Sequence, residues 1–223
     1  MHTNTDHVTG VPTHLRRLES PIGRIEVIGN GEAIVSLAIE RDGALPWDGV
    51  PEQGDPVLDR AVEQLEEYFA GHRRDFDLPL SLAGTAFQLA VWEQIAALDF
   101  GEVVSYGELG LGTGRATAGR AVGGAVGANP IPIIVPCHRV LGSDGRITGY
   151  SGGDGIPTKS WLLQHEGIAH IASGVRVSGR PSDDSENQLD IGQLDIGQVD
   201  TGEFDTSRLD ASQLDGAHVG QPA

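Results

Sequence analysis

The sequence contains very little cysteine and lysine: Cys137 is the only cysteine among 223 residues, and Lys159 is the only lysine. A single cysteine excludes an internal disulfide, so a reducing, cytoplasmic setting is expected. No apolar run approaches the roughly 20 residues of a membrane span, and no secretory segment follows Met1, so no membrane partner is expected. The eight histidines show no ligand spacing, which predicts that the protein binds no metal. No cofactor is expected either.

The formal net charge of −17 argues against a nucleic-acid partner only if the charge is spread evenly over the chain. Residues 81–180 contain seven acidic and seven basic residues, whereas residues 181–223 contain ten acidic residues and one basic residue. The middle segment is therefore the part of the chain best able to approach DNA. Its basic residues are six arginines and Lys159, so anion recognition there would depend mainly on guanidinium groups.

The hydrophobic pattern of the first third predicts an antiparallel sheet with a covering helix. Alternating apolar residues indicate strands over 14–19, 24–28 and 33–39. Apolar residues at helical spacing indicate a helix over 57–69, and residues 75–82 are expected to be an extended linker. These elements define an N-terminal α/β domain over residues 13–80, preceded by a flexible segment of residues 1–12.

The second domain, over residues 81–174, is expected to be mostly helical, so that the fold class is α+β. Thr85 and Ser105 are good N-caps for helices over 87–98 and 106–111. A further helix over 117–128 would complete a helix-turn-helix, although an ordinary helical hairpin explains the same pattern. A short buried strand over 131–135 is expected to lead to Cys137, and a last helix to start at Trp161, include Glu166 and stop at Gly167.

The acidic tail of residues 175–223 has a repeat of its own. From Gln188 six five-residue units follow without a gap, each with a large apolar residue followed by an aspartate. The pattern faintly resembles a pentapeptide-repeat solenoid. Low hydrophobicity and high net charge favour a disordered tail instead.

Cys137 lies between an apolar run and the basic pair His138 and Arg139. A neighbouring cation or base favours the thiolate, which is the nucleophilic form, and Pro136 fixes the backbone before it. An unpaired cysteine is also one of the most commonly buried and inert residues. Adjacency alone leaves both interpretations open.

Short motifs follow one another in order over residues 84–167. The most specific are those over residues 120–123, 129–130, 136–140, 149–153 and 162–166. Together they resemble the O6-alkylguanine-DNA alkyltransferases, also called methylated-DNA–protein-cysteine methyltransferases. The resemblance is looser over residues 15–80 and does not extend to the tail.

The resemblance implies DNA repair by direct, stoichiometric and irreversible transfer of an alkyl group to the protein itself. Cys137 would accept the group from O6-alkylguanine in double-stranded DNA, with O4-alkylthymine as a further substrate, and no step would regenerate the thiol. His138 would take the thiol proton through a water molecule, and Glu166 would orient the imidazole. Tyr106 would supply a proton or donor to the departing base, and Asn129 would tie the helix-turn-helix to the active-site segment.

The resemblance also implies how a monomer would bind DNA. A stacked base cannot reach a buried thiol, so the nucleotide must be flipped out of the duplex. Arg120 resembles an arginine finger that enters the gap from the minor groove, where small residues allow close approach. The further residues assigned to the DNA or the flipped base are Ala121, Gly123, Pro132, Val135, Arg139, Tyr150 and Ser151.

Three other classes of protein remain to be weighed against this hypothesis. A non-catalytic lesion sensor of the same fold would lack the cysteine, which is present here. A transcriptional regulator activated by its own alkylation would need an additional cysteine-rich metal domain, which the sequence does not contain. A cysteine hydrolase on an unrelated fold would give Arg120 no role.

Overall fold

The computed structural model of the chain describes residues 10–114 and 119–171, which all belong to one compact unit. Three predicted features lie wholly or partly outside the described residues. They are the N-terminal segment of residues 1–12, the start of the helix expected over 117–128, and the acidic tail of residues 175–223.

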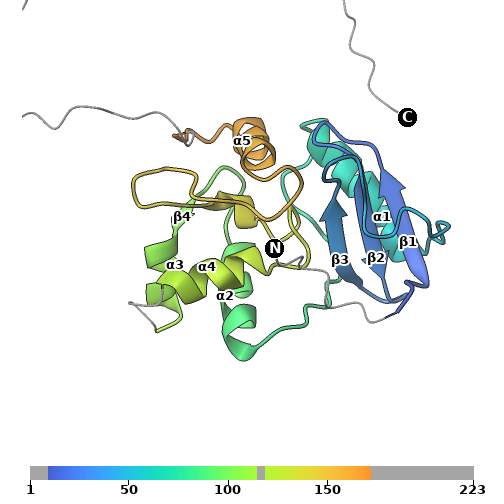
Figure 1. Ribbon diagram of the computed structural model, residues 1–223, viewed down its shortest axis with the longest axis horizontal. Helices are drawn as coiled ribbons and strands as arrows, with labels where there is room; N and C mark the ends of the chain where they lie inside the picture. Colours follow the sequence, from blue (N-terminus) through green and yellow to red (C-terminus); the bar gives the residue numbers. More distant parts are fainter. Residues whose placement is uncertain (1–9, 115–118, 172–223) are drawn as a thin grey trace, which may run out of the picture. The chain divides into compact units, whose positions relative to one another are not determined.

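A three-stranded antiparallel sheet forms the N-terminal part, as predicted (Figure 1). Its order is β1 (His14–Leu18), β2 (Ile25–Gly29) and β3 (Ile34–Ile39). Helix α1 (Pro56–Phe69) covers one face, and the Asp55 side chain caps its N-terminus. The central strand β2 is buried along its whole length because it has a neighbour on each side.

The predicted linker continues this sheet. The backbone N–H of Ile34 donates to the carbonyl of Pro79 over 2.9 Å, and the N–H of Ser81 donates to the carbonyl of Ile34 over 2.9 Å. Extended backbone thus supplies hydrogen-bond partners for both backbone groups of Ile34 on the outer edge of β3, and the chain then continues to the second domain.

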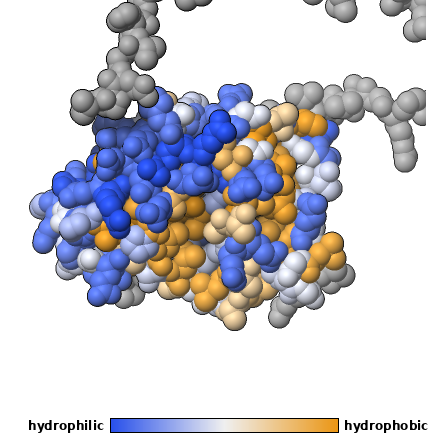
Figure 2. Space-filling view, turned by 180° about the vertical axis from the view of Figure 1, so that it is seen from behind, coloured by the Kyte–Doolittle hydropathy of each residue, from blue (hydrophilic) through white to orange (hydrophobic). Residues whose placement is uncertain are grey.

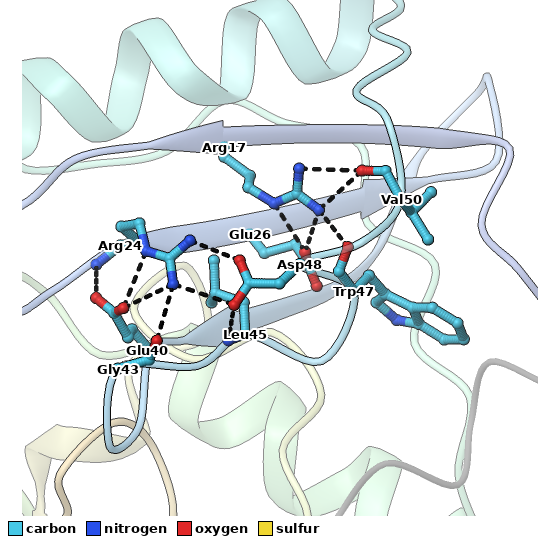
Figure 3. Close-up of polar contacts among 9 residues, drawn as sticks. All are labelled: Arg17, Arg24, Glu26, Glu40, Gly43, Leu45, Trp47, Asp48 and Val50. Carbon is cyan, nitrogen blue, oxygen red and sulfur yellow. Dashed lines mark hydrogen bonds and ion pairs between the residues drawn. The ribbon is translucent and has the colours of Figure 1, made fainter.

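Two arginines hold the segment that follows β3 (Figure 3). The guanidinium of Arg17 donates to the buried Glu26 and to the carbonyls of Trp47 and Val50. Arg24 binds the Glu40 and Asp48 carboxylates and the carbonyl of Gly43. Residues 40–50 are therefore fixed to the sheet by charged donors from β1 and from the residue that precedes β2.

The second part consists mainly of α2 (Ala86–Ala96), α3 (Tyr106–Gly112), α4 (Gly119–Gly127) and α5 (Ile156–His165). Thr85 and Ser105 cap α2 and α3 as predicted, each within a capping box. The buried Trp92 joins two of these helices, because its Nε1–H donates to the carbonyl of Ala125 over 2.8 Å. This contact holds α2 against α4.

A short parallel pair of strands brings the start of α3 to the cysteine. β4 (Val104–Ser105) pairs with β5 (Val140–Leu141). Tyr106 directly follows β4, and a 3-10 turn over Cys137–Arg139 directly precedes β5. The pairing therefore places Tyr106 and Cys137 in the same region although 31 positions of sequence separate them.

Two predicted elements are wrong in detail. Residues 131–135 are buried but form a turn, in which the N–H of Val135 donates to the carbonyl of Ile131 over 2.9 Å. Prolines at 130, 132 and 136 have no N–H to give to a ladder, which explains why no strand forms. The last helix begins at Ile156 rather than Trp161, because Pro157 is accepted in a first helical turn, and Glu166 is its C-cap residue.

The two parts differ in surface character. Figure 2 shows that hydrophilic residues predominate where the sheet and α1 form the surface, and that apolar residues are more frequent over the helical part. Leu89, Val103 and Leu111 are among the exposed apolar residues there. The described part of the chain contains no helix both long and apolar enough to cross a membrane.

Candidate active site

Cys137 lines a pocket of about 490 Å³ and is itself only 2% exposed. The walls come from α3, α4, α5 and the loop over residues 148–151. They include Tyr106, Gly123, Gly149, Tyr150, Ser151 and Lys159. The thiol is therefore reachable only through the pocket, which is large enough for a flat aromatic base.

Glu166 accepts four hydrogen bonds beside the cysteine turn. Its Oε1 accepts from His138 Nε2 over 2.8 Å, from Arg139 over 3.0 Å and from the hydroxyl of Tyr68 over 2.9 Å. Its Oε2 accepts from Arg139 Nε over 2.7 Å. Burial raises the pKa of Glu166, but the hydrogen bonds from His138 and Arg139 outweigh it and hold the pKa at about 2. The side chain is a carboxylate at neutral pH.

The imidazole of His138 is arranged as a base. It is completely buried, and burial lowers its pKa more than the carboxylate of Glu166 raises it. The ring is therefore neutral near pH 7. Because Nε2 faces the carboxylate and carries the proton, the lone pair lies on Nδ1, which has no hydrogen-bond partner among the described residues.

Burial raises the pKa of the Cys137 thiol, so that the cysteine is mostly protonated at rest. Three groups act against burial by favouring the thiolate. They are the amide of Asn129, the ammonium of Lys159 and the hydroxyl of Tyr150. Deprotonation therefore needs a base, but the surroundings of the sulfur can accept the resulting charge.

Lys159 is a functional candidate that the sequence reasoning missed. It is 1% exposed, and its Nζ donates to the carbonyl of Val140 over 2.6 Å. Burial lowers the pKa of Lys159 to about 8, although the negative charge of a Cys137 thiolate acts to raise it. The sequence offered only the fact that this is the one lysine of the chain, because its place beside Cys137 in the pocket lining is seen only in the structure.

Asn129 ties together the buried turn before the cysteine. Its Nδ2 donates to the carbonyl of Val135 over 2.7 Å, and its Oδ1 accepts from the N–H of Ile131 over 3.1 Å. A side-chain amide thus supplies the backbone contacts that a strand would otherwise make.

Helix α4 presents a bare surface at the pocket. Gly123 lines the pocket, whereas Arg120 and Ala121 are exposed to solvent. A Cβ added at Gly119 or Gly123 would meet nothing within 4 Å. Packing inside the described chain therefore does not require a glycine at either position, and this part of the α4 surface has room for another molecule.

Three of the residues expected at the DNA or the base lie elsewhere. Pro132 lines a neighbouring cavity, and Val135 is completely buried outside the pocket lining. Arg139 is 5% exposed and bound to Glu166 and to the carbonyl of Leu98, which leaves little of its guanidinium for the predicted DNA contact. The reason is that a buried carboxylate needs a cation beside it, and Arg139 meets that need.

Tyr68 was also missed, because its position on α1 matched the helical spacing of an ordinary core residue. Its hydroxyl reaches Glu166 across 98 positions of sequence. No group of three or more His, Cys, Asp or Glu side chains that could hold a metal ion is found among the described residues.

The fold and the site define a two-part α+β protein with one buried cysteine at a pocket, followed in sequence by an imidazole that a buried carboxylate binds. Residues 14–82 match the family described as 6-O-methylguanine DNA methyltransferase, ribonuclease-like domain, and residues 86–168 match the DNA binding domain of the same name. The chain therefore belongs to the 6-O-methylguanine DNA methyltransferase family.

Individual relatives agree with this assignment. A methylated-DNA–protein-cysteine methyltransferase of Haemophilus influenzae is 43% identical over 157 residues, which are 70% of this chain and 87% of the relative. The crystal structure of the Mycobacterium tuberculosis O6-methylguanine methyltransferase matches with a TM-score of 0.61 and 42% identity, over 69% of this chain and 92% of that one. The same enzyme in complex with DNA matches with a TM-score of 0.61 and 43% identity, over 69% and 93%.

Proposed function

We propose that this protein repairs alkylated DNA by moving the alkyl group from O6 of guanine to Sγ of Cys137, once per molecule. The observation that carries the proposal is the buried pair of Glu166 and His138: Nδ1 of His138 has no hydrogen-bond partner among the described residues, and His138 directly follows Cys137, the thiol that lines the pocket, in the sequence. The names of the relatives, which state transfer from methylated DNA to a protein cysteine, support the activity. O4-alkylthymine is proposed as a second substrate.

In the proposed reaction, Nδ1 of His138 takes the thiol proton through a water molecule, and Sγ attacks the alkyl carbon. The S–C bond forms as the C–O6 bond breaks, and the electron pair leaves on guanine. The Tyr106 hydroxyl donates a proton to the base, so that neutral guanine departs. The thioether has no second thiol to resolve it, because Cys137 is the only cysteine.

The electrostatic setting supports this assignment of roles. A base must be unprotonated before it acts, and burial keeps His138 in that state. The thiolate formed in the reaction gains from the nearby ammonium of Lys159. Glu166 holds the imidazole in the tautomer whose lone pair is on Nδ1.

The proposed partner is double-stranded DNA, approached from the minor groove by a monomer with the target base flipped into the pocket. The M. tuberculosis relative has been crystallised with DNA. Helices α3 and α4 would act as the helix-turn-helix, with Ala121 and Gly123 allowing close approach. Arg120 would enter the gap that the flipped nucleotide leaves.

Replacing Arg120 with alanine is expected to slow repair of duplex DNA by roughly 10- to 100-fold, because unstacking a base costs a few kcal/mol and the finger would no longer offset it. Reaction with free O6-benzylguanine should stay unchanged, since no base is flipped. Single-turnover rates on the two substrates measure this, with Arg146→Ala as a control for loss of one exposed positive charge in the same domain. An equal loss on both substrates would sink the finger assignment.

The activity itself is tested by mass spectrometry. Purified protein incubated with an equimolar duplex containing one O6-methylguanine is expected to gain one methylene, confined to the peptide that carries Cys137 and limited to one per chain. A duplex with O4-methylthymine tests the second substrate in the same way. Tight binding of the lesion without a gain in mass would favour a sensor instead.

A further inference from the structure

The loop over residues 149–153 forms one wall of the candidate pocket. Gly149, Tyr150 and Ser151 line the pocket together with Cys137. The loop has no regular secondary structure, so no ladder of its own holds it in place. Its position must be set by contacts with other elements, and those contacts decide the width of the pocket.

Arg41, in the N-terminal domain, binds this loop through two nitrogens of its guanidinium. Its Nε donates to the carbonyl of Gly153 over 2.7 Å, and its Nη2 donates to the carbonyl of Ser151 over 2.7 Å. The planar fork of arginine matches two acceptors spaced in this way. The neighbouring Glu40 carboxylate does not compete, because Arg24 binds it.

The turn that carries Arg41 is closed by hydrogen bonds. The backbones of Arg41 and Ala44 exchange two hydrogen bonds of 3.0 Å, around Asp42 and Gly43 at positive φ angles of 52° and 77°. Arg24 fixes the carbonyl of Gly43 over 3.1 Å (Figure 3). The donor is thus anchored to the sheet before it meets the loop.

Packing against Ile39 adds to the hydrogen bonds that Arg41 makes with the loop. A Cβ built on Gly152 would approach the side chain of Ile39 to 3.2 Å, and one built on Gly153 would approach it to 3.0 Å. The loop therefore lies directly on the last residue of β3, and Arg41, two positions later, closes over it.

We propose that Arg41 is a positioning residue for alkyl transfer, through which the N-terminal domain fixes the loop of residues 149–153 and so the pocket around the reacting base. Arg41 does not line the Cys137 pocket, so it acts through the loop and touches no reacting atom. The proposal rests on the proposed function of that pocket. It gives the N-terminal domain, which supplies none of the pocket-lining side chains, a part in the reaction.

Replacing Arg41 with alanine is expected to lower the single-turnover rate about tenfold, because a displaced loop would no longer hold the base in the orientation needed for transfer. The loss should be the same on methylated duplex and on free O6-benzylguanine, and it should fall on the rate at saturation rather than on DNA affinity. Hydrogen exchange of the peptide that contains residues 149–153 should become faster, with no substrate present. Arg41→Lys keeps the charge but not the fork, and should recover only part of the rate.

Arg73→Ala is the matched control, because Arg73 also binds a backbone carbonyl and lies away from the loop. It should change neither rate nor exchange in the loop. A loss for Arg41→Ala on duplex alone would show a phosphate contact and overturn the proposal, and so would full recovery by lysine or unchanged exchange in the loop. If the wild-type protein transfers nothing, the proposed function fails, while the exchange measurement still decides whether Arg41 holds the loop.

Discussion

Replacing Cys137 with alanine is expected to abolish alkyl transfer completely, while binding of the lesion is retained. No other thiol in the chain can accept the group, because Cys137 is the only cysteine. A hydroxyl does not substitute for it, since the neutral hydroxyl of serine is a far weaker nucleophile than a thiolate, so Cys137→Ser should be equally inactive.

Binding should survive because a cysteine that is 2% exposed contributes little surface to the flipped base. Mass spectrometry measures transfer, and fluorescence anisotropy with an O6-methylguanine duplex measures affinity. Any gain of a methylene by the alanine variant would show that another side chain accepts the alkyl group. Loss of lesion binding together with transfer would mean that the thiol shapes the pocket rather than only reacting in it.

Replacing Glu166 with glutamine is expected to lower both stability and activity by large amounts. The change removes the charge that balances the buried Arg139, and breaking a buried pair on one side costs about 3–5 kcal/mol. It also replaces the charged acceptor of His138 with a neutral amide that can either accept from or donate to Nε2, so the tautomer is no longer fixed, which should lower the transfer rate by roughly 100-fold or more. Urea unfolding and single-turnover kinetics measure the two effects.

Two further variants separate stability from chemistry. Glu67→Gln breaks an exposed pair with Arg73 and should cost less than about 1 kcal/mol. The double variant Glu166→Gln with Arg139→Met removes the uncompensated charge as well, and should recover much of the stability while the transfer rate stays low. Recovery of activity in the double variant would contradict the role of Glu166 as the orienting partner of His138.

The same carboxylate predicts a dependence of stability on pH. Its pKa is about 2 in the folded protein, below the ordinary value of 4.5, so the folded state favours the ionised form. The stabilisation is complete above about pH 4.5 and is lost as the pH falls toward 2. The free energy of unfolding of the wild type should therefore fall by on the order of 3 kcal/mol more than that of Glu166→Gln across this window.

Local patterns predicted most of the fold, because each depends on neighbours in sequence. The alternation in residues 14–39 and the caps at Thr85 and Ser105 gave the sheet and two helices correctly. The errors lie at prolines, which can prevent a strand or occupy the first turn of a helix. Pro132 was accepted within a strand although it cannot donate to one, and Pro157 was treated as a loop residue although it lies in the first turn of α5.

The sequence by itself determined the family, the single candidate nucleophile and the adjacent His138, since these lie in short continuous motifs. Only the tertiary structure decided that Arg139 neutralises Glu166, that Tyr68 donates to the same carboxylate and that Arg41 holds the loop. Contacts of this kind join residues up to 112 positions apart. They depend on which groups burial brings together and which charges must then be balanced, and no spacing along the chain records that.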